Sequence, residues 1–242
     1  MNDTLNNIRI VLIQTSHPGN IGSAARAMKT MGLSKLYLVK PKIFPDEQAN
    51  TMSSNATDIL DKAVVTETLQ GALSGCELVI GTSARHARTL AWDILDPRAS
   101  AERMAKQAAM AEVAIVFGRE SSGLTNDELA LCHYLVHIPT NPEYSSLNIA
   151  SAVQILSYEC RIAVESKKTD EPVSENKDPL VTADEMEGYF GHLESAMIAS
   201  NFLDPEKPKH LMTRLRRIYG RVKLTQSELN ILRGMLASFG KK

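Results

Sequence analysis

The sequence predicts an α/β domain with a mostly parallel sheet, followed by a small helical extension. Over the first 165 residues, short β-rich runs alternate with longer helical patterns, which is typical of α/β folds. The run at 113–117 is apolar throughout, as expected for a strand that helices cover on both faces. After a polar stretch at 166–180 the apolar spacing becomes purely helical. We therefore predict an α/β domain at 1–165, a linker at 166–180 and a helical unit at 181–242.

The elements follow from β-rich runs, apolar spacing and capping patterns. Strands are predicted at 8–13, 36–39, 63–66, 78–80, 113–117 and 135–138, and helices at 21–31, 99–110 and 147–164. In the extension, Thr182 with Glu185 and Thr225 with Glu228 have the spacing of capping boxes, in which each side chain binds the other residue's backbone N–H. A further amphipathic helix is predicted by Leu211, Leu215, Ile218 and Val222.

Composition excludes several classes of protein. The 242 residues are 43% hydrophobic, enough for a sizeable core, and 27 Lys and Arg against 28 Asp and Glu exclude a globally basic coat. No apolar run is long enough to span a membrane, and the start does not resemble a signal peptide, so we expect a cytoplasmic protein. Cys76, Cys132 and Cys160 are odd in number and widely spaced, unlike a disulfide framework or a zinc cluster. We expect no metal.

Charge is unevenly distributed. The stretch 181–242 holds ten Lys and Arg against seven Asp and Glu, a net charge of +3. Between Lys207 and Lys223 there are seven basic residues and no acidic one. Such a run is often a solvated helix face. The alternative is a phosphate-binding surface, since the cluster has no acidic partner within its own helix. Its candidate RNA-binding residues are Arg214, Arg216, Arg217 and Arg221.

Three motifs follow predicted strands, where ligands of open α/β sheets bind. Residues 15–26 read TSHPGNIGSAAR, in which two glycines permit a tight turn and Asn20 can cap the following helix. This loop lacks the G-x-G-x-x-G spacing of nicotinamide and flavin sites. Residues 117–124 read FGRESSGL, where Gly118 would let a flat ligand approach the backbone and Arg119 could pair with Glu120. Residues 138–150 read IPTNPEYSSLNIA, a stiff loop with polar groups at a helix start.

Together these motifs carry a resemblance to a known family. In order and spacing, NIGSAAR at 20–26, FGRESSGL at 117–124 and PEYSSLN at 142–148 resemble the signatures of the SPOUT (trefoil-knotted) RNA 2′-O-ribose methyltransferases. GTSAR at 81–85 and ELNILRG at 228–234 extend the likeness to tRNA-modifying members, over essentially the whole chain. The resemblance implies a knot in the C-terminal part of the α/β domain and a homodimer. Knots are very rare among protein folds, so the prediction of a knot rests on the resemblance alone.

The resemblance also implies a cofactor, S-adenosylmethionine, and the residues that hold it. Carried over to this sequence, the cofactor-binding residues are Thr82, Ser83, Ala84, Gly118, Ile138, Ser145, Ser146 and Leu147. Arg26, Asn20 and Ser146 are the implied catalytic residues, and Glu120 would anchor Arg119 or nearby backbone. A guanidinium is a poor base. We therefore favour an Arg26 that holds an RNA phosphate and orients the hydroxyl, with proton acceptance as the other possibility.

The implied substrate is tRNA, methylated on cytidine or uridine at position 32 of the anticodon loop. Two alternatives remain open on the same fold. A ribosomal RNA 2′-O-methyltransferase would not need the helical extension. A non-catalytic RNA-binding factor would predict a broken cofactor loop or a replaced Arg26, and here both motifs are intact.

Overall fold

The structure is a computed structural model that describes residues 3–83, 93–166, 178–207 and 209–239. Its strands are β1 (Ile8–Ile13), β2 (Lys35–Val39), β3 (Val64–Thr66), β4 (Cys76–Thr82), β5 (Ile94–Leu95), β6 (Glu112–Phe117) and β7 (Tyr134–Val136). They form one sheet in the order β3-β2-β1-β6-β4-β7-β5, and every pairing between them is parallel. The predicted α/β fold with a mostly parallel sheet is confirmed. The trefoil knot stays a prediction.

Eight helices in the described part of the first 166 residues connect and cover the strands. They are α1 (Asp3–Asn6), α2 (Pro18–Met31), α3 (Glu47–Ser53), α4 (Thr57–Asp61), α5 (Leu69–Leu73), α6 (Pro97–Ala108), α7 (Asn126–Leu129) and α8 (Ile149–Ser166). All three long helices of the sequence analysis are present, as α2, α6 and α8. The short helices and the two-residue strand β5 were not predicted.

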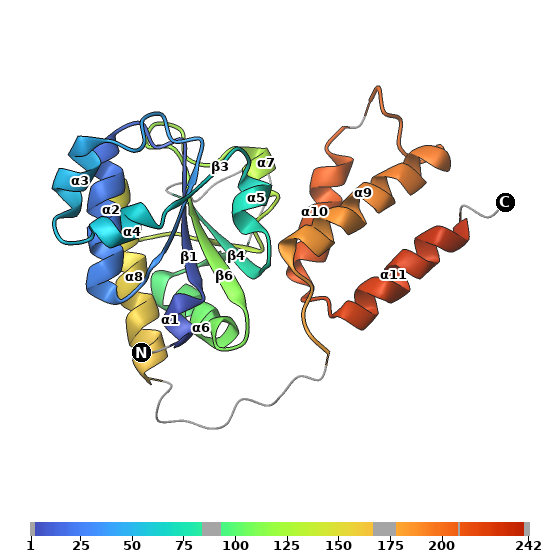
Figure 1. Cartoon of the computed structure of the whole chain (residues 1–242). Helices are drawn as coiled ribbons and strands as arrows, with labels where there is room; N and C mark the ends of the chain where they lie inside the picture. The colour runs from blue at the N-terminus through green and yellow to red at the C-terminus, as the bar shows by residue number, and fades with distance from the viewer. Residues whose placement is uncertain (1–2, 84–92, 167–177, 208, 240–242) are drawn as a thin grey trace.

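The sheet is buried on both faces, which explains why its central strands are nearly all apolar. Ile8, Ile10 and Leu12 of β1 join a core with α2, α6 and α8. Val11 and Ile13 point to the opposite face and join a smaller core with α5 and α7. All six residues of β1 are buried, as a strand between two helical layers requires. Figure 1 shows the helices on either side of the sheet.

Gly22 fixes how closely two helices approach. It lies inside α2, where a Cβ atom would come within 2.0 Å of the Ala49 carbonyl oxygen of α3. Gly22 was predicted to lie in a tight turn, but the helix begins earlier, at Pro18. His17 is the N-cap and Pro18 the first helical residue, so Asn20 lies in the first turn and is not the cap. The missing side chain of Gly22 instead allows α3 to pack against α2.

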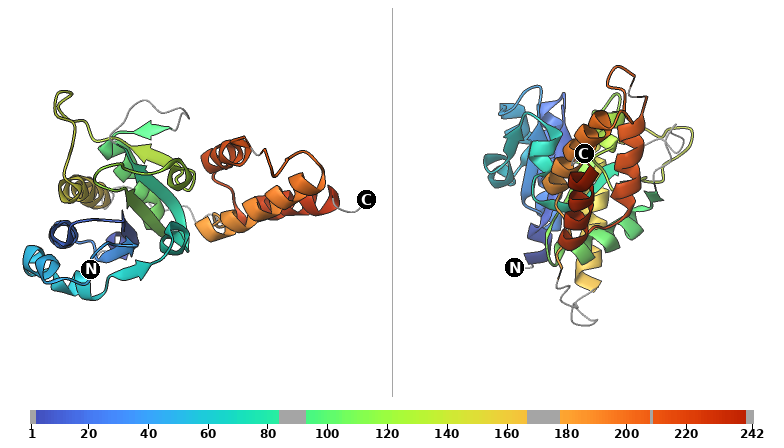
Figure 2. Two further views of the ribbon diagram at one scale, coloured as in Figure 1. Left: turned by 90° about the horizontal axis from the view of Figure 1, so that it is seen from above. Right: turned by 90° about the vertical axis from the view of Figure 1, so that its right-hand side faces the viewer.

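The extension forms three helices with a core of their own. These are α9 (Ala183–Ala199), α10 (Leu211–Arg221) and α11 (Gln226–Phe239). Tyr189, Phe190 and Leu193 of α9 lie in that core, together with Leu224 and Leu229. The Thr182–Glu185 capping box is present as predicted. Figure 2 shows this tail extending from one side of the α/β domain.

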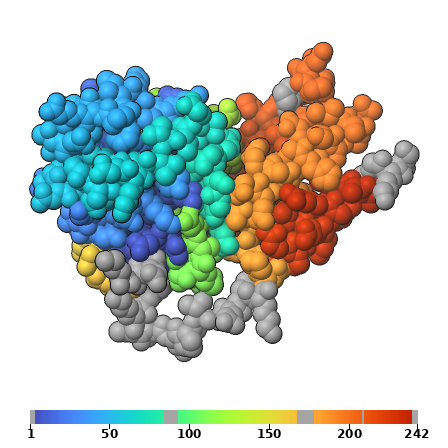
Figure 3. Space-filling view, in the orientation of Figure 1, coloured from blue at the N-terminus to red at the C-terminus, as the bar shows by residue number. Residues whose placement is uncertain are grey.

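The tail packs against the α/β domain beside α5. Helix α9 contacts α5 and β4, and the Asp184 carboxylate accepts a hydrogen bond of 3.1 Å from the Gly75 backbone N–H. Figure 3 shows the two units in contact along this side. The stretch 166–180 was predicted as a linker, but Ser166 ends α8 and Leu180 pairs with Thr225 of the tail. Both ends of that stretch therefore belong to the neighbouring units.

No helix in the described ranges is long and apolar enough to cross a bilayer.

Candidate functional site

A pocket of about 330 Å³ lies at the carboxyl ends of β4, β6 and β7. Three segments that are far apart in the sequence line it, because parallel strands end at the same edge of a sheet. Its lining includes seven of the eight residues that the family resemblance assigns to the cofactor, namely Thr82, Ser83, Gly118, Ile138, Ser145, Ser146 and Leu147. Ala84, the eighth, lies outside the described residues. The second and third motifs thus line one cavity together with the end of β4, whereas no residue of the first motif lines it.

The end of β4 is held by hydrogen bonds to its neighbouring strands. The Thr82 hydroxyl donates to the Val116 carbonyl oxygen at 3.1 Å, and the Ser83 N–H donates to the Val136 carbonyl at 3.0 Å. A ring nitrogen of His137 lies 2.9 Å from the Ser83 carbonyl oxygen. These bonds fix the floor of the pocket across β6, β4 and β7.

The turn after β6 closes on itself. Arg119 and Gly123 exchange backbone hydrogen bonds of 3.2 and 2.9 Å, and Gly123 has the left-handed φ of 69° that glycine tolerates. A Cβ atom on Gly118 would lie 2.2 Å from the Gly123 carbonyl carbon. Gly118 is therefore required by the packing of its own turn. The approach of a flat ligand, expected from the sequence, is not needed to explain this glycine.

Arg119 pairs with Glu128, and not with Glu120 as considered from the sequence. Two guanidinium nitrogens donate to the two Glu128 carboxylate oxygens at 2.9 Å each, and Nε donates to Gln14 at 2.8 Å. The hydrogen bonds to Glu128 raise the pKa of Arg119. Burial opposes ionisation of Glu128, but the bonds from Arg119 and Thr125 outweigh it and lower the pKa of that carboxyl. This forked pair attaches the motif-two turn to α7.

Glu120 instead connects all three motifs. Its carboxylate accepts from the Ser16 N–H at 3.3 Å, the Ser16 hydroxyl at 3.2 Å and the Asn20 amide at 3.0 Å. The Asn20 side-chain oxygen accepts from the Asn148 amide at 3.0 Å. Asn148 in turn caps α8 by accepting from the Ala150 N–H at 2.8 Å. Asn148 was not among the predicted site residues, because the helix was predicted to begin at 147 and it begins at Ile149.

Arg26 lies apart from this pocket within its own chain. It is exposed on α2, six residues beyond Asn20, or about 9 Å along the helix axis. It is absent from the pocket lining, and its guanidinium makes no ion pair with any residue that the structure describes. The chain therefore presents a free cation beside the motif-one turn, where another molecule could meet it.

The four tail arginines differ in their surroundings. Arg214 and Arg221 are exposed on α10. Arg216 makes a forked pair with Glu187 of α9 at 2.6 and 2.7 Å, and its guanidinium lies 4.5 Å from the centre of the Phe190 ring. Arg217 is partly buried, and its Nε has no hydrogen-bond partner in the structure. The cluster has no acidic partner within α10, as the sequence predicts, but Arg216 is paired with a carboxylate of a different helix.

Comparison with known proteins identifies the chain. Residues 7–158 match the model of the SpoU rRNA Methylase family. The chain belongs to this family. Residues 184–242 match a second model, the C-terminal domain of the tRNA methyltransferase TrmJ. The two matched segments correspond to the α/β domain and the tail.

Relatives of this SpoU-family chain cover nearly its full length. The tRNA (cytidine/uridine/adenosine-2′-O-)-methyltransferase TrmJ of Pseudomonas aeruginosa is 55% identical, over 98% of this chain and 95% of that protein. The tRNA (cytidine/uridine-2′-O-)-methyltransferase TrmJ of Yersinia pestis is 53% identical over 98% and 93%. Among solved structures, TrmJ from Z. mobilis is 31% identical with a TM-score of 0.84, covering 96% of this chain and 99% of that one.

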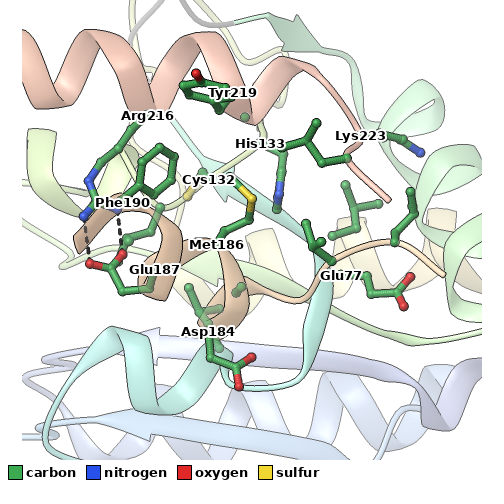
Figure 4. A pocket seen from close by; sticks show the side chains of 18 of the residues that line it. Glu77, Cys132, His133, Asp184, Met186, Glu187, Phe190, Arg216, Tyr219 and Lys223 are labelled. Carbon is green, nitrogen blue, oxygen red and sulfur yellow. Dashed lines mark hydrogen bonds and ion pairs between the residues drawn. The ribbon is translucent and has the colours of Figure 1, made fainter. Parts of the chain in front are cut away.

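A second cavity of the SpoU-family chain, of about 300 Å³, lies between the α/β domain and the tail (Figure 4). Its walls are largely apolar, with Leu73, Leu78 and Cys132 on one side and Met186, Phe190 and Tyr219 on the other. Burial lowers the pKa of His133, which lines it, to about 4, and the His133 Nδ1 accepts from the Val79 N–H at 3.0 Å. This histidine is neutral near pH 7 and supports the fold of β4. Among the predicted catalytic and cofactor residues that the structure describes, none lines this cavity.

In this SpoU-family chain, replacing Glu120 with glutamine is expected to weaken the hydrogen bonds around the pocket at the ends of β4, β6 and β7. It should also change how the free energy of unfolding depends on pH. Burial raises the pKa of Glu120, but its backbone and Asn20 and Ser16 hydrogen bonds outweigh that effect, so its pKa lies below the ordinary 4.5. A carboxyl whose pKa is lower in the folded state than in the unfolded state stabilises the folded state at any pH above its unfolded pKa. This stabilisation is lost as the pH falls through the folded-state pKa. Glutamine does not titrate, so the Glu120→Gln variant should not show this part of the fall in stability at acid pH. Denaturant unfolding from pH 7 to pH 3 would measure it.

Glu143→Gln is the matched control for that comparison, since Glu143 is an exposed carboxylate in the neighbouring loop. If Glu120→Gln and Glu143→Gln have the same pH dependence as the unmodified protein, the hydrogen bonds to Glu120 do not stabilise the folded state.

Proposed function

We propose that this chain is an S-adenosylmethionine-dependent tRNA 2′-O-ribose methyltransferase that acts on cytidine and uridine at position 32 of the anticodon loop, in the cytoplasm. The observation that carries the proposal is one pocket that the second and third motifs line, in a chain whose tail matches the TrmJ C-terminal domain. The first motif is joined to that pocket through the hydrogen bonds of Ser16 and Asn20 to Glu120. The TrmJ relatives of Pseudomonas and Yersinia are named as tRNA 2′-O-methyltransferases.

The pocket fits such a cofactor in size and in chemistry. Its volume lies in the range of small-molecule sites, about 300–1,000 Å³. Apolar walls from Phe117, Val136, Ile138 and Leu147 suit an adenine ring, while hydroxyls of Ser83, Ser121 and Ser145 suit ribose and carboxylate groups. The bound cofactor would supply an electrophilic methyl group on a sulfonium. A solved SpoU methyltransferase structure, AviRb from Streptomyces viridochromogenes with AdoMet, shares the fold at 22% identity.

The protein's part in this reaction is placement. Holding a ribose hydroxyl in line with a reactive methyl group can supply about 7–11 kcal/mol of the barrier. Asn20 and Ser146 would shape the entrance, because Asn20 is fixed by Glu120 and Asn148 while Ser146 lines the pocket. Arg26 would hold the adjacent RNA phosphate with its planar fork and orient the hydroxyl.

Because Arg26 is absent from its own chain's pocket, we infer that the active form is a homodimer with shared sites. Arg26 of one subunit would meet the cofactor pocket of the other. Mixing an Arg26→Ala subunit with a Ser146→Ala/Leu147→Asp subunit should restore part of the activity, since one intact site forms in each mixed dimer. If the subunits exchange and no activity returns, the site is not shared.

The function is tested with the purified protein, S-adenosylmethionine and unmodified tRNA. We expect one methyl group per tRNA on the ribose of nucleotide 32. A tRNA with a 2′-deoxy sugar at that nucleotide is the control and should accept none. Methylation of ribosomal RNA in place of tRNA would assign the chain to the other substrate class. No methylation of either RNA, with RNA still bound, would indicate a non-catalytic RNA-binding factor.

A further inference from the structure

The loop between β7 and α8 carries an exposed aromatic ring at the rim of the cofactor pocket. Thr140 and the run 145–147 line the pocket. Tyr144, between them, is 79% exposed. Only 5% of the chain is aromatic. In the tail, by contrast, Tyr189, Phe190 and Tyr219 pack against one another.

The backbone that carries this ring is well fixed. The Tyr144 N–H donates to the Asn141 carbonyl oxygen at 3.0 Å, and the Glu143 N–H donates to the Asn141 side chain at 3.0 Å. Pro139 and Pro142 restrict the loop further. At its far end, Asn148 is bonded to Asn20 of motif one. The loop therefore presents the tyrosine in a defined place, so that little order is lost when a partner binds.

The Tyr144 ring has no ring contact or side-chain hydrogen bond within the described ranges. A large, exposed aromatic surface on a stiff loop beside a reactive site suits a flat partner. Nucleobases stack on aromatic rings, and such stacking tolerates different bases because every base has a π face. Glu143, which precedes Tyr144 in the chain, is exposed to solvent.

We propose that Tyr144 is a substrate-positioning residue, whose ring stacks on a nucleobase at or next to the nucleotide whose ribose enters the pocket. This proposal rests on the proposed function and adds the residue that holds the unstacked nucleotide. Stacking explains how cytidine and uridine can both be accepted, because the tyrosine ring contacts the flat face of the base and not its hydrogen-bonding edge. The phenol hydroxyl has no part in it.

The test uses the full chain and an anticodon stem-loop RNA that carries 2-aminopurine beside nucleotide 32. Stacking on tyrosine should quench the 2-aminopurine fluorescence on binding. Tyr144→Phe keeps the ring and should keep both quenching and methylation. Tyr144→Leu keeps the apolar bulk without the ring, so quenching should disappear and KM for RNA should rise about ten- to a hundred-fold. Cofactor affinity, measured by calorimetry, should stay unchanged.

Glu143→Ala is the control for loop disturbance and should behave as the unmodified protein. Quenching that persists in Tyr144→Leu overturns the proposal. So does a fall in cofactor affinity, which would make Tyr144 a wall of the cofactor pocket, or a shift to monomers, which would place it in a subunit interface. Because quenching is measured without cofactor, it is independent of methyl transfer. A protein that quenches but never methylates any RNA would refute the proposed function and leave the stacking inference standing.

Discussion

Arg26→Ala is expected to reduce methyl transfer by about 10²- to 10³-fold or more while S-adenosylmethionine affinity stays unchanged. The large effect follows because the guanidinium would position the RNA phosphate and hydroxyl, and small misplacements of reacting groups are costly. The cofactor should be unaffected because Arg26 does not line the pocket of its own chain. Calorimetry with cofactor and single-turnover methylation of tRNA would separate the two steps.

Arg26→Lys distinguishes charge from geometry at the same position. Lysine keeps the positive charge but loses the planar fork, so this variant should also fail. Arg161→Ala is the matched control, since it removes a guanidinium from α8 that is already paired with Glu165 at 2.9 Å. Substantial turnover by Arg26→Lys would show that charge alone is needed at this position. Lost cofactor binding in Arg26→Ala would place Arg26 in the cofactor site.

Much of the fold could be predicted because the central strands are simple in sequence. Strands such as β1 and β6 are buried on both faces and are therefore nearly all apolar. The elements that were missed are short. Helices α4 and α5 have five residues each and β5 has two, too few for an apolar period to emerge. Their positions depend on packing against the larger elements.

The position of the site could be predicted, because strand ends bring its motifs together. The ion pairs of individual side chains could not. Parallel topology alone places the ends of β4, β6 and β7 at one edge. By contrast, Arg119 had an adjacent carboxylate, Glu120, and pairs with Glu128 on the next helix instead. Arg216 likewise pairs with Glu187, 29 residues away. Such pairings depend on tertiary distances that sequence spacing does not contain.

Removal of the tail after Ser166 is expected to leave a folded α/β domain that binds cofactor and binds tRNA weakly. The domain has its own two cores, on the two faces of the sheet, so it should fold alone. It should be less stable than the full chain, because α9 covers apolar residues of α5 and β4 such as Leu73 and Leu78. Thermal unfolding, calorimetry with cofactor and tRNA titration of both proteins would measure these three properties.

Charge reversal in the tail tests whether its basic surface contacts phosphate. Arg214→Glu and Arg221→Glu change exposed residues, so they should weaken tRNA binding and flatten its salt dependence by about one unit of slope per lost contact. Arg216→Glu is a different experiment, because it breaks the forked pair with Glu187 beneath the Phe190 ring and should destabilise the tail itself. Cofactor affinity should be unchanged in the first two variants. Unchanged tRNA affinity in both, at physiological salt, would make the stretch a solvated helix face. Lys29, Arg85 and Arg88 of the first 165 residues would then be the next candidates for tRNA recognition.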